Sequence, residues 1–173
     1  MAIPLQAFTA LGAIEGTVAA SGRLGELLET VTTLAVRDVR LAPLDGGPLE
    51  TAAGGELPVD ELLFVLAPPD TPTLMHAAWH PLSLVLGPYR IEAELPTLPG
   101  FDPARALARP GGQFVLVGRA SVGLVQLPDE EVQAVGFGWV DRYAVDRVAA
   151  DIDLSLFFPG AHIEVRAGGL TGA

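Results

Sequence analysis

The chain contains no cysteine and no lysine. The lack of cysteine excludes disulfide bonds, thiol nucleophiles, thiolate metal sites and iron–sulfur clusters. The lack of lysine excludes P-loop lysines, Schiff-base chemistry and the catalytic lysine of kinases. Together the two absences remove several large enzyme classes before any motif is considered.

Positive charge is scarce as well. The only strongly basic residues are 10 arginines, against 21 aspartates and glutamates, and the formal net charge is −11 at pH 7. Proteins that bind nucleic acids need clustered cations to displace counterions from the phosphates, and no stretch of this sequence supplies such a cluster. The same shortage disfavours anionic membrane surfaces. We therefore expect neither a nucleic acid nor a membrane as partner.

The sequence also lacks a long hydrophobic run. Its longest apolar stretch, near residues 62–69, is far shorter than the roughly 20 residues that a membrane-spanning helix needs. Residues 1–11 have no basic region ahead of their apolar residues, as a signal peptide would have. We therefore expect a cytoplasmic protein.

Hydrophobic residues are nevertheless abundant, at 50% of the 173 residues. This fraction is high for a small monomer, since a short chain must leave much of its surface in water. Many of these residues are alanine, which contributes little apolar area. The excess suggests a buried face between subunits or between repeats, and we expect a homo-oligomer.

The same order of predicted elements occurs twice along the chain. Each copy reads as an extended segment, a short helix and two further strands. The first copy comprises residues 13–18, 22–28, 34–44 and 57–66, and the second comprises residues 90–95, 102–107, 114–125 and 132–140. The order, lengths and gaps agree although residue identity is low, which is typical of duplicated supersecondary units.

This pattern predicts a β-rich α+β protein. Its two internally similar strand–short helix–strand–strand units pack as one compact domain or as two small ones, because an isolated unit would expose its hydrophobic face. We expect the first unit at residues 1–70, a connecting segment at 71–88, the second unit at 89–167 and a mobile tail at 168–173.

Two histidines, His76 and His80, are spaced as on one face of a helix, where both imidazoles can bind a metal. Pro81 follows directly and disfavours a helix through His80. Two histidines without a third ligand do not make a zinc site, and the spacing identifies no third ligand. We therefore predict no metal and no cofactor, with these histidines as the only metal candidates and ordinary polar or interface roles as the alternative.

The segment from Trp139 to Tyr143 contains two aromatic rings together with Asp141 and Arg142. Such sets occur in small-molecule sites and in protein–protein hot spots. They also occur where a buried Arg–Asp pair lies under aromatic packing. In an extended strand Arg142 points away from the other three. These four residues and Trp79 are our candidates for binding a ligand or a partner.

No catalytic motif accompanies these candidates. No serine lies in a Gly-x-Ser-x-Gly nucleophile elbow, and Gly111-Gly112 does not open a dinucleotide-binding pattern. The acidic run Asp129-Glu130-Glu131 follows a proline at a turn, where solvated charges are usual. We assign no catalytic residue.

Three functional hypotheses remain. The first is a non-enzymatic protein–protein interaction or self-assembly module, of unknown pathway, that binds itself or another protein. The second is a small-molecule-binding protein with a pocket between the two units, near Trp79, Trp139 and Tyr143. The third is a hydrolase or isomerase that uses only Asp, Glu and His. The lack of catalytic motifs favours the first hypothesis.

Overall fold

The computed structural model describes residues 2–73, 75–98, 112–127, 130 and 132–166. These residues form one α-helix, α1 (Leu24–Thr30), one 3-10 turn, η1 (Val59–Glu61), and eleven strands. The strands are β1 (Ala2–Thr9), β2 (Gly12–Ala19), β3 (Thr33–Pro43), β4 (Glu50–Pro58), β5 (Leu62–Leu66), β6 (Ala78–Leu86), β7 (Tyr89–Thr97), β8 (Phe114–Leu124), β9 (Gln133–Asp141), β10 (Arg147–Ala150) and β11 (His162–Val165). The prediction of a β-rich protein is confirmed.

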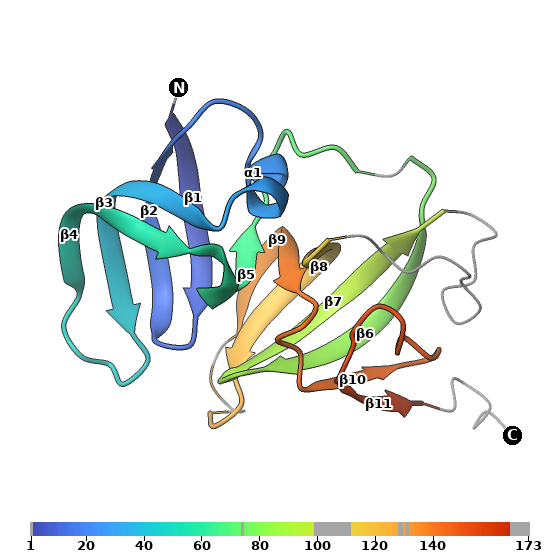
Figure 1. Ribbon diagram of the computed structural model, residues 1–173. Helices are drawn as coiled ribbons and strands as arrows, with labels where there is room; N and C mark the ends of the chain where they lie inside the picture. Colours follow the sequence, from blue (N-terminus) through green and yellow to red (C-terminus); the bar gives the residue numbers. More distant parts are fainter. Residues whose placement is uncertain (1, 74, 99–111, 128–129, 131, 167–173) are drawn as a thin grey trace, which may run out of the picture.

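The described strands belong to a single sheet with the order β11-β10-β6-β7-β8-β9-β5-β1-β2-β3-β4 (Figure 1). The first half, residues 2–66, is an antiparallel meander of β1 to β4, with β5 returning to pair with β1. The second half, residues 75–166, is a meander of β6 to β9, with β10 returning to pair with β6. β11 then pairs with β10 in parallel at the end of the sheet.

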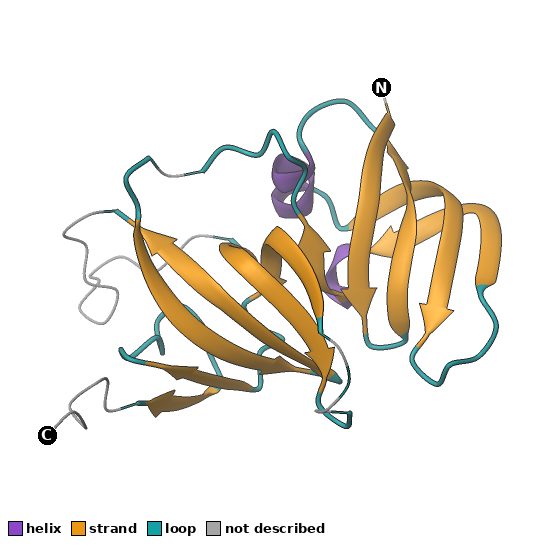
Figure 2. Ribbon diagram, turned by 180° about the vertical axis from the view of Figure 1, so that it is seen from behind, coloured by secondary structure: helices purple, strands orange, loops and turns teal. Residues whose placement is uncertain are grey.

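The helix α1 lies between the two halves, as Figure 2 shows from behind. Its buried residues Leu24 and Leu28 are one turn apart and so face the same side. The helix ends before Val31, where the β-branched run of residues 31–33 favours extended backbone. The short helix predicted at residues 22–28 therefore occurs at nearly the predicted place.

β5 joins the two halves because it pairs with β1 on one side and with β9 on the other. Its adjacent residues Phe64 and Val65 are both fully buried, and they point to opposite faces of the sheet. Val65 belongs to a first core, and Phe64 belongs to a second core. One five-residue strand thus contributes to both cores.

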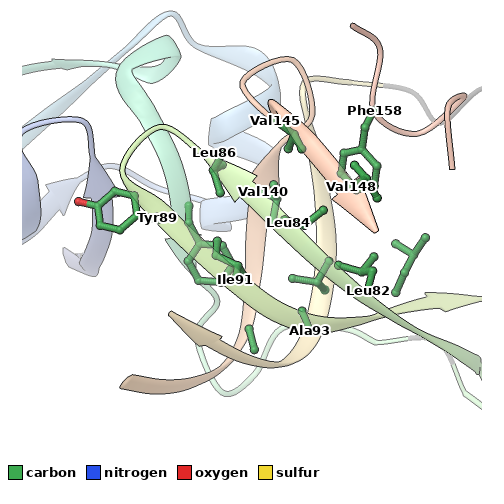
Figure 3. Packing of buried hydrophobic residues seen from close by; sticks show 14 of the residues in the cluster. Leu82, Leu84, Leu86, Tyr89, Ile91, Ala93, Val140, Val145, Val148 and Phe158 are labelled. Carbon is green, nitrogen blue, oxygen red and sulfur yellow. The ribbon is translucent and has the colours of Figure 1, made fainter. Parts of the chain in front are cut away.

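The first core fills the first half and extends to β8. Its buried residues are Leu5, Ala7, Ile14, Val18, Leu24, Leu28, Leu34, Val36, Leu57, Val59, Leu62, Val65 and Phe114. The second core fills the second half, and Figure 3 shows its side chains converging from β6, β7 and β9 and from Val145, Val148 and Phe158. On β6 and β7 the buried residues alternate with more exposed ones, as the period-two pattern of a half-buried strand requires.

The third strand of each meander is bent at its middle. β3 and β8 are both eleven residues long, and the sixth residue of each has a positive φ, 51° at Asp38 and 48° at Arg119. The pairing of each strand with the strand before it changes register close to this point. Such bulges increase the local twist and let the sheet curl around each core.

The main difference from the sequence prediction lies between residues 50 and 66. The sequence prediction places no element at residues 45–56, a glycine-rich gap between two strands, whereas residues 50–56 belong to β4. The single strand predicted at residues 57–66 is divided by η1 into the end of β4 and β5. β4 lies at the end of the described sheet, and its first seven residues are exposed, so this stretch lacks the apolar alternation that marks a half-buried strand.

Some predictions fall on residues that the structure does not describe. They are the helix at residues 102–107, Asp129 and Glu131 of the acidic run, and the tail at residues 168–173. The segment expected to connect the units, residues 71–88, contains β6. In the described part of the chain, none of the helical segments has the length and apolar character needed to cross a membrane.

Candidate functional site

A pocket of about 460 Å³ lies at the junction of the two halves. Five parts of the chain line it: residues 2–4 of β1, residues 22–26 at the start of α1, residues 68 and 70–72 after β5, Leu116 of β8 and Trp139 of β9. We call it the junction pocket. Its volume falls in the range of roughly 300–1,000 Å³ that is usual for small-molecule sites.

The apolar wall of the junction pocket is built from facing strands. Leu116 and Trp139 are directly opposite each other in the ladder of β8 and β9, so both side chains point to the same side of the sheet. Leu24 of α1 and Pro68 after β5 extend this wall. Together they provide a hydrophobic surface for the body of a ligand.

Contact between α1 and β9 is close at Gly25. A Cβ atom placed on Gly25 would lie 2.9 Å from Cζ2 of Trp139, which is closer than real side chains allow. The indole ring therefore packs directly on the helix backbone. A glycine at this position permits the approach, although glycine is a poor helix former.

The polar groups of the pocket lie at its rim. Arg23, Glu26 and Asp70 are exposed, and Thr71 is half-buried. This set offers one guanidinium, two carboxylates and one hydroxyl. It is suited to orienting the polar groups of a bound molecule through hydrogen bonds and charge.

The position of α1 beside the pocket is fixed by a glutamate. The carboxylate of Glu29 accepts hydrogen bonds from the backbone N–H groups of Gln113, at 3.2 Å, and of Phe114, at 3.3 Å. These groups lie at the start of β8. Two hydrogen bonds to one carboxylate hold α1 against the second half, beside the pocket.

Asp141 is one of the predicted binding residues, and its side chain is 3% exposed. Its carboxylate accepts hydrogen bonds from Nε2 of Gln113 and from the backbone N–H of Tyr143, both at 3.0 Å. Burial raises the pKa of Asp141 above its ordinary value, and these hydrogen bonds act in the opposite direction. Its hydrogen bonds connect the end of β9 to Gln113 and to the turn at Tyr143.

Arg142 is also buried, at 3% exposure. Its Nε and Nη2 atoms donate to the backbone oxygen of Gly112 at 3.1 and 2.6 Å, and Nη1 donates to that of Phe157 at 3.2 Å. The guanidinium also lies 5.2 Å from the ring centre of Tyr143, whose side chain is 61% exposed. Arg142 thus links three segments, and Tyr143 projects toward solvent.

Trp79 lies on β6, apart from the residues that line the junction pocket. Its ring packs on Phe137, with ring centres 6.0 Å apart and planes inclined at 59°. A Cβ atom on Gly118 would lie 2.8 Å from the ring of Trp79. The indole can therefore pack on the backbone of β8 only because residue 118 has no side chain. Of the five predicted binding residues, Trp139 alone is among the described lining residues.

The two histidines are not on a helix. His76 is exposed in a turn with φ of 55°, whereas His80 lies in β6 with Nε2 3.0 Å from Oγ1 of Thr97. Throughout the residues for which the structure gives positions, no three side chains of the metal-binding types gather into a possible metal site.

A second feature is the free side of β4. This strand pairs with β3 and ends the sheet, on the outer side of the molecule (Figure 1). Residues 50–56 are all exposed, and we call them the β4 edge. The exposed residues Arg37 and Arg40 of β3 lie opposite Gly54 and Thr51 of the β4 edge. Two cations therefore border the edge on one face.

Sequence reasoning missed several parts of both features. The glycine at position 25 inside a short helix was the one available signal for a close approach to another element. The partners of Glu29 lie 84 and 85 positions along the chain, so no local pattern indicates them.

A scan of protein-family models and searches of curated proteins and of solved structures found no match to this chain.

Proposed function

We propose that the protein is a non-enzymatic interaction module that binds an extended protein segment along the β4 edge. The observation that carries this proposal is the exposure of seven consecutive residues, 50–56, on a strand that has one neighbour among the described strands of the sheet. The backbone N–H and C=O groups on the free side of an edge strand form a template for pairing with another strand. Strand addition at such an edge is a common mode of peptide recognition.

We also propose that the two halves are copies of one unit, which bears on what the β4 edge binds. Matching hydrogen bonds support this. The N–H of Val59, after the fourth strand of the first meander, donates to the oxygen of Thr32, ahead of its third strand, at 2.9 Å. The N–H of Arg142 donates to the oxygen of Gln113 at the same places of the second meander, also at 2.9 Å.

A second pair of hydrogen bonds matches in the same way. The N–H of Leu44, after the third strand, donates to the oxygen of Leu11 between the first two strands at 3.1 Å. Its counterpart runs from Val125 to Pro88 at 2.9 Å. The equal lengths of β3 and β8 and their shared central bulge agree with this match. The helix expected in the second unit, at residues 102–107, lies outside the described residues.

If the halves are copies, β9 is the counterpart of β4. The outer side of β9 is occupied by β5, an antiparallel apolar strand, through the pairs Phe64–Val140, Val65–Trp139 and Leu66–Gly138. The ring of Phe64 packs directly on Gly138, where a Cβ atom would collide with it. This arrangement supports a β4 edge that accepts a strand in the same antiparallel direction.

Photo-crosslinking tests the proposal in cells that make the protein. A photoreactive residue at Thr51, on the β4 edge, should form adducts with a protein partner or with a second copy. The same residue at Ser155, exposed in the second half, is the matched control and should form none. Ala53→Lys should abolish the adducts, because a lysine on an edge strand opposes pairing. Absence of adducts from position 51 would contradict the proposal.

A second candidate function is the binding of a small molecule in the junction pocket. The contact of Trp139 with α1 favours it, because a pocket with a fixed aromatic wall is formed in advance of binding. Native mass spectrometry of the purified protein reports both a bound molecule and the number of subunits. Trp139→Ala should lose any bound mass, whereas Trp79→Ala should keep it, since Trp79 lies elsewhere. A protein without added mass would count against this candidate.

A further inference from the structure

We propose that the occupant of the β4 edge is the β4 edge of a second copy, paired antiparallel about a two-fold axis at Gly55. This inference rests on the proposed function and specifies its partner. A two-fold interface requires that one surface be complementary to itself. The charge pattern of β3 and β4 meets this requirement in one register.

The side chains of Arg37 and Glu56 lie on the same face of the sheet. Residues directly opposite in an antiparallel pair point to the same face of the sheet. Arg37 is opposite Gly54, and Ala35 is opposite Glu56. Gly54 and Glu56 are two positions apart on β4 and so share that face as well. One face of the edge therefore presents a cation beside a glycine and, two positions along, an anion beside an alanine.

Pairing about Gly55 places Glu56 of the second copy opposite Gly54. The row across the four strands is then Arg37, Gly54, Glu56 of the second copy and Ala35 of the second copy. Neighbouring strands are about 4.8 Å apart, so the Cα atoms of Arg37 and that Glu56 lie about 10 Å apart. Gly54 has no side chain between them, and an arginine and a glutamate together span this distance. The two-fold axis repeats the ion pair, so each dimer has two.

The competing register is less favourable. Pairing about Ala53 would use all seven exposed residues, but it places Glu50 of each copy opposite Glu56 of the other. Like charges directly opposite each other destabilise a strand pair. Pairing of β4 with β10 of another copy, in the manner of β9 with β5, is prevented because β11 already covers β10. Of these two registers about a residue of β4, the charges favour the one about Gly55, which also forms the ion pair of Arg37 with Glu56 of the second copy.

A cysteine at the axis tests the register directly. Opposite residues in an antiparallel pair have Cα atoms about 4.5–5.5 Å apart, which suits a disulfide. A Cβ atom on Gly55 meets nothing within 4 Å, and the chain has no other cysteine. Gly55→Cys should therefore give a covalent dimer under mild oxidation. Thr51→Cys is the control, because the two copies of residue 51 would be about 27 Å apart along the strands.

Charge reversal tests the ion pairs. Arg37 and Glu56 are both exposed, so reversing either leaves the core intact. R37E and E56R should each weaken dimerisation about tenfold or more in sedimentation velocity, because each replaces two attractions by two repulsions. The double variant should return to within about threefold of the native constant. A dimer whose constant is unchanged by either single reversal would overturn the proposal.

These experiments distinguish a failure of the proposed dimer from a failure of the proposed interaction function. A chain that stays monomeric at all concentrations overturns pairing of two copies, yet crosslinks from Thr51 to a different protein would leave the interaction function standing. Absence of both the dimer and the crosslinks overturns both. The register is established if the double charge reversal restores dimerisation and if Gly55→Cys, but not Thr51→Cys, forms a disulfide between the two copies.

Discussion

Gly25 and Trp139 touch where the only described α-helix crosses the sheet, with no room for a side chain on the glycine. This contact fixes one wall of the junction pocket. It also ties the first half of the molecule, which contains α1, to the second half, which contains β9.

The contact predicts an unusual response to Gly25→Ala. Replacing glycine by alanine in a helix ordinarily stabilises it by up to about 1 kcal/mol. Here the added methyl group must displace the indole, so we expect no gain in the free energy of unfolding. In a Trp139→Leu background the ordinary gain should return. Urea denaturation of the four variants in this double-mutant cycle measures the effect, and an equal gain in both backgrounds would show that the contact is absent in solution.

The shared strand β5 predicts that the two cores unfold together. Phe64→Ala should lower the free energy of unfolding by about 3–5 kcal/mol, because it leaves a cavity in the second core. Circular dichroism and tryptophan fluorescence should nevertheless report one coincident transition. Glu61→Ala, at an exposed position just before β5, is the control and should change stability by less than about 0.5 kcal/mol. Two separate transitions would indicate halves that unfold independently.

Tyr89 predicts a loss of stability at high pH. Its hydroxyl donates a hydrogen bond to the backbone oxygen of Thr9 at 2.6 Å, and burial raises its pKa from 10.0 to about 12. The unfolded chain releases this proton near pH 10, whereas the folded chain keeps it until near pH 12. The contribution of Tyr89 is therefore complete below pH 10 and is lost as the pH rises from 10 to 12.

Tyr89→Phe provides the comparison for this prediction. The variant should be less stable at pH 7 by about 1–3 kcal/mol, because a buried carbonyl loses its partner. The difference between native protein and variant should shrink between pH 10 and 12. Urea denaturation at a series of pH values measures it, and a constant difference over this range would show that the two states of the native chain release the proton at the same pH.

Asp141 predicts a change of the same sign at lower pH, because stability should again fall as the pH rises through its pKa. Because burial raises its pKa, the folded carboxyl binds a proton at a higher pH than the unfolded one, and its ionised form lowers stability at neutral pH. Asp141→Asn should therefore raise the free energy of unfolding at pH 7, and the difference should fade as the pH drops below the ordinary range for Asp. Chemical denaturation between pH 3 and 7 provides the measurement.

Asp153 is a matched control with the opposite sign. The backbone N–H and side chain of Ser155 donate hydrogen bonds that lower the pKa of Asp153, so its ionised form adds stability at neutral pH. Asp153→Asn removes the same unit of charge but should lower stability at pH 7. If both variants shift stability in the same direction, the effect comes from the net charge of the protein and the local assignment for Asp141 is wrong.

The strands with a clear apolar pattern, either alternating or continuous, were predictable from the sequence. β7 and β8 occur close to the expected places because one face of each strand packs on a core and the pattern records that packing. β4 was missed because neither face of its first seven residues is buried. An exposed edge strand forms because its backbone hydrogen-bonds to the neighbouring strand. Its own residues therefore need no apolar pattern from which the strand could be predicted.

The candidate site was predictable only in part. Trp139 was singled out and lines the junction pocket, whereas Tyr143 and Trp79 point elsewhere. Their separation depends on the turn after β9 and on the curvature of the sheet, and both are set by distant partners. Arg142 illustrates this, because its side chain bonds to backbone oxygens 30 and 15 positions away.

The position of β5 has a consequence for synthesis on the ribosome. Three strands lie between β5 and its neighbour β9 in the sequence, so β5 is translated well before β9. During that interval the nascent chain holds an apolar strand with one open side and the side chain of Phe64 without its final contacts. Such a segment pairs readily with other nascent chains. Slow translation of residues 67–141 should therefore lower the yield of native protein more than slow translation elsewhere.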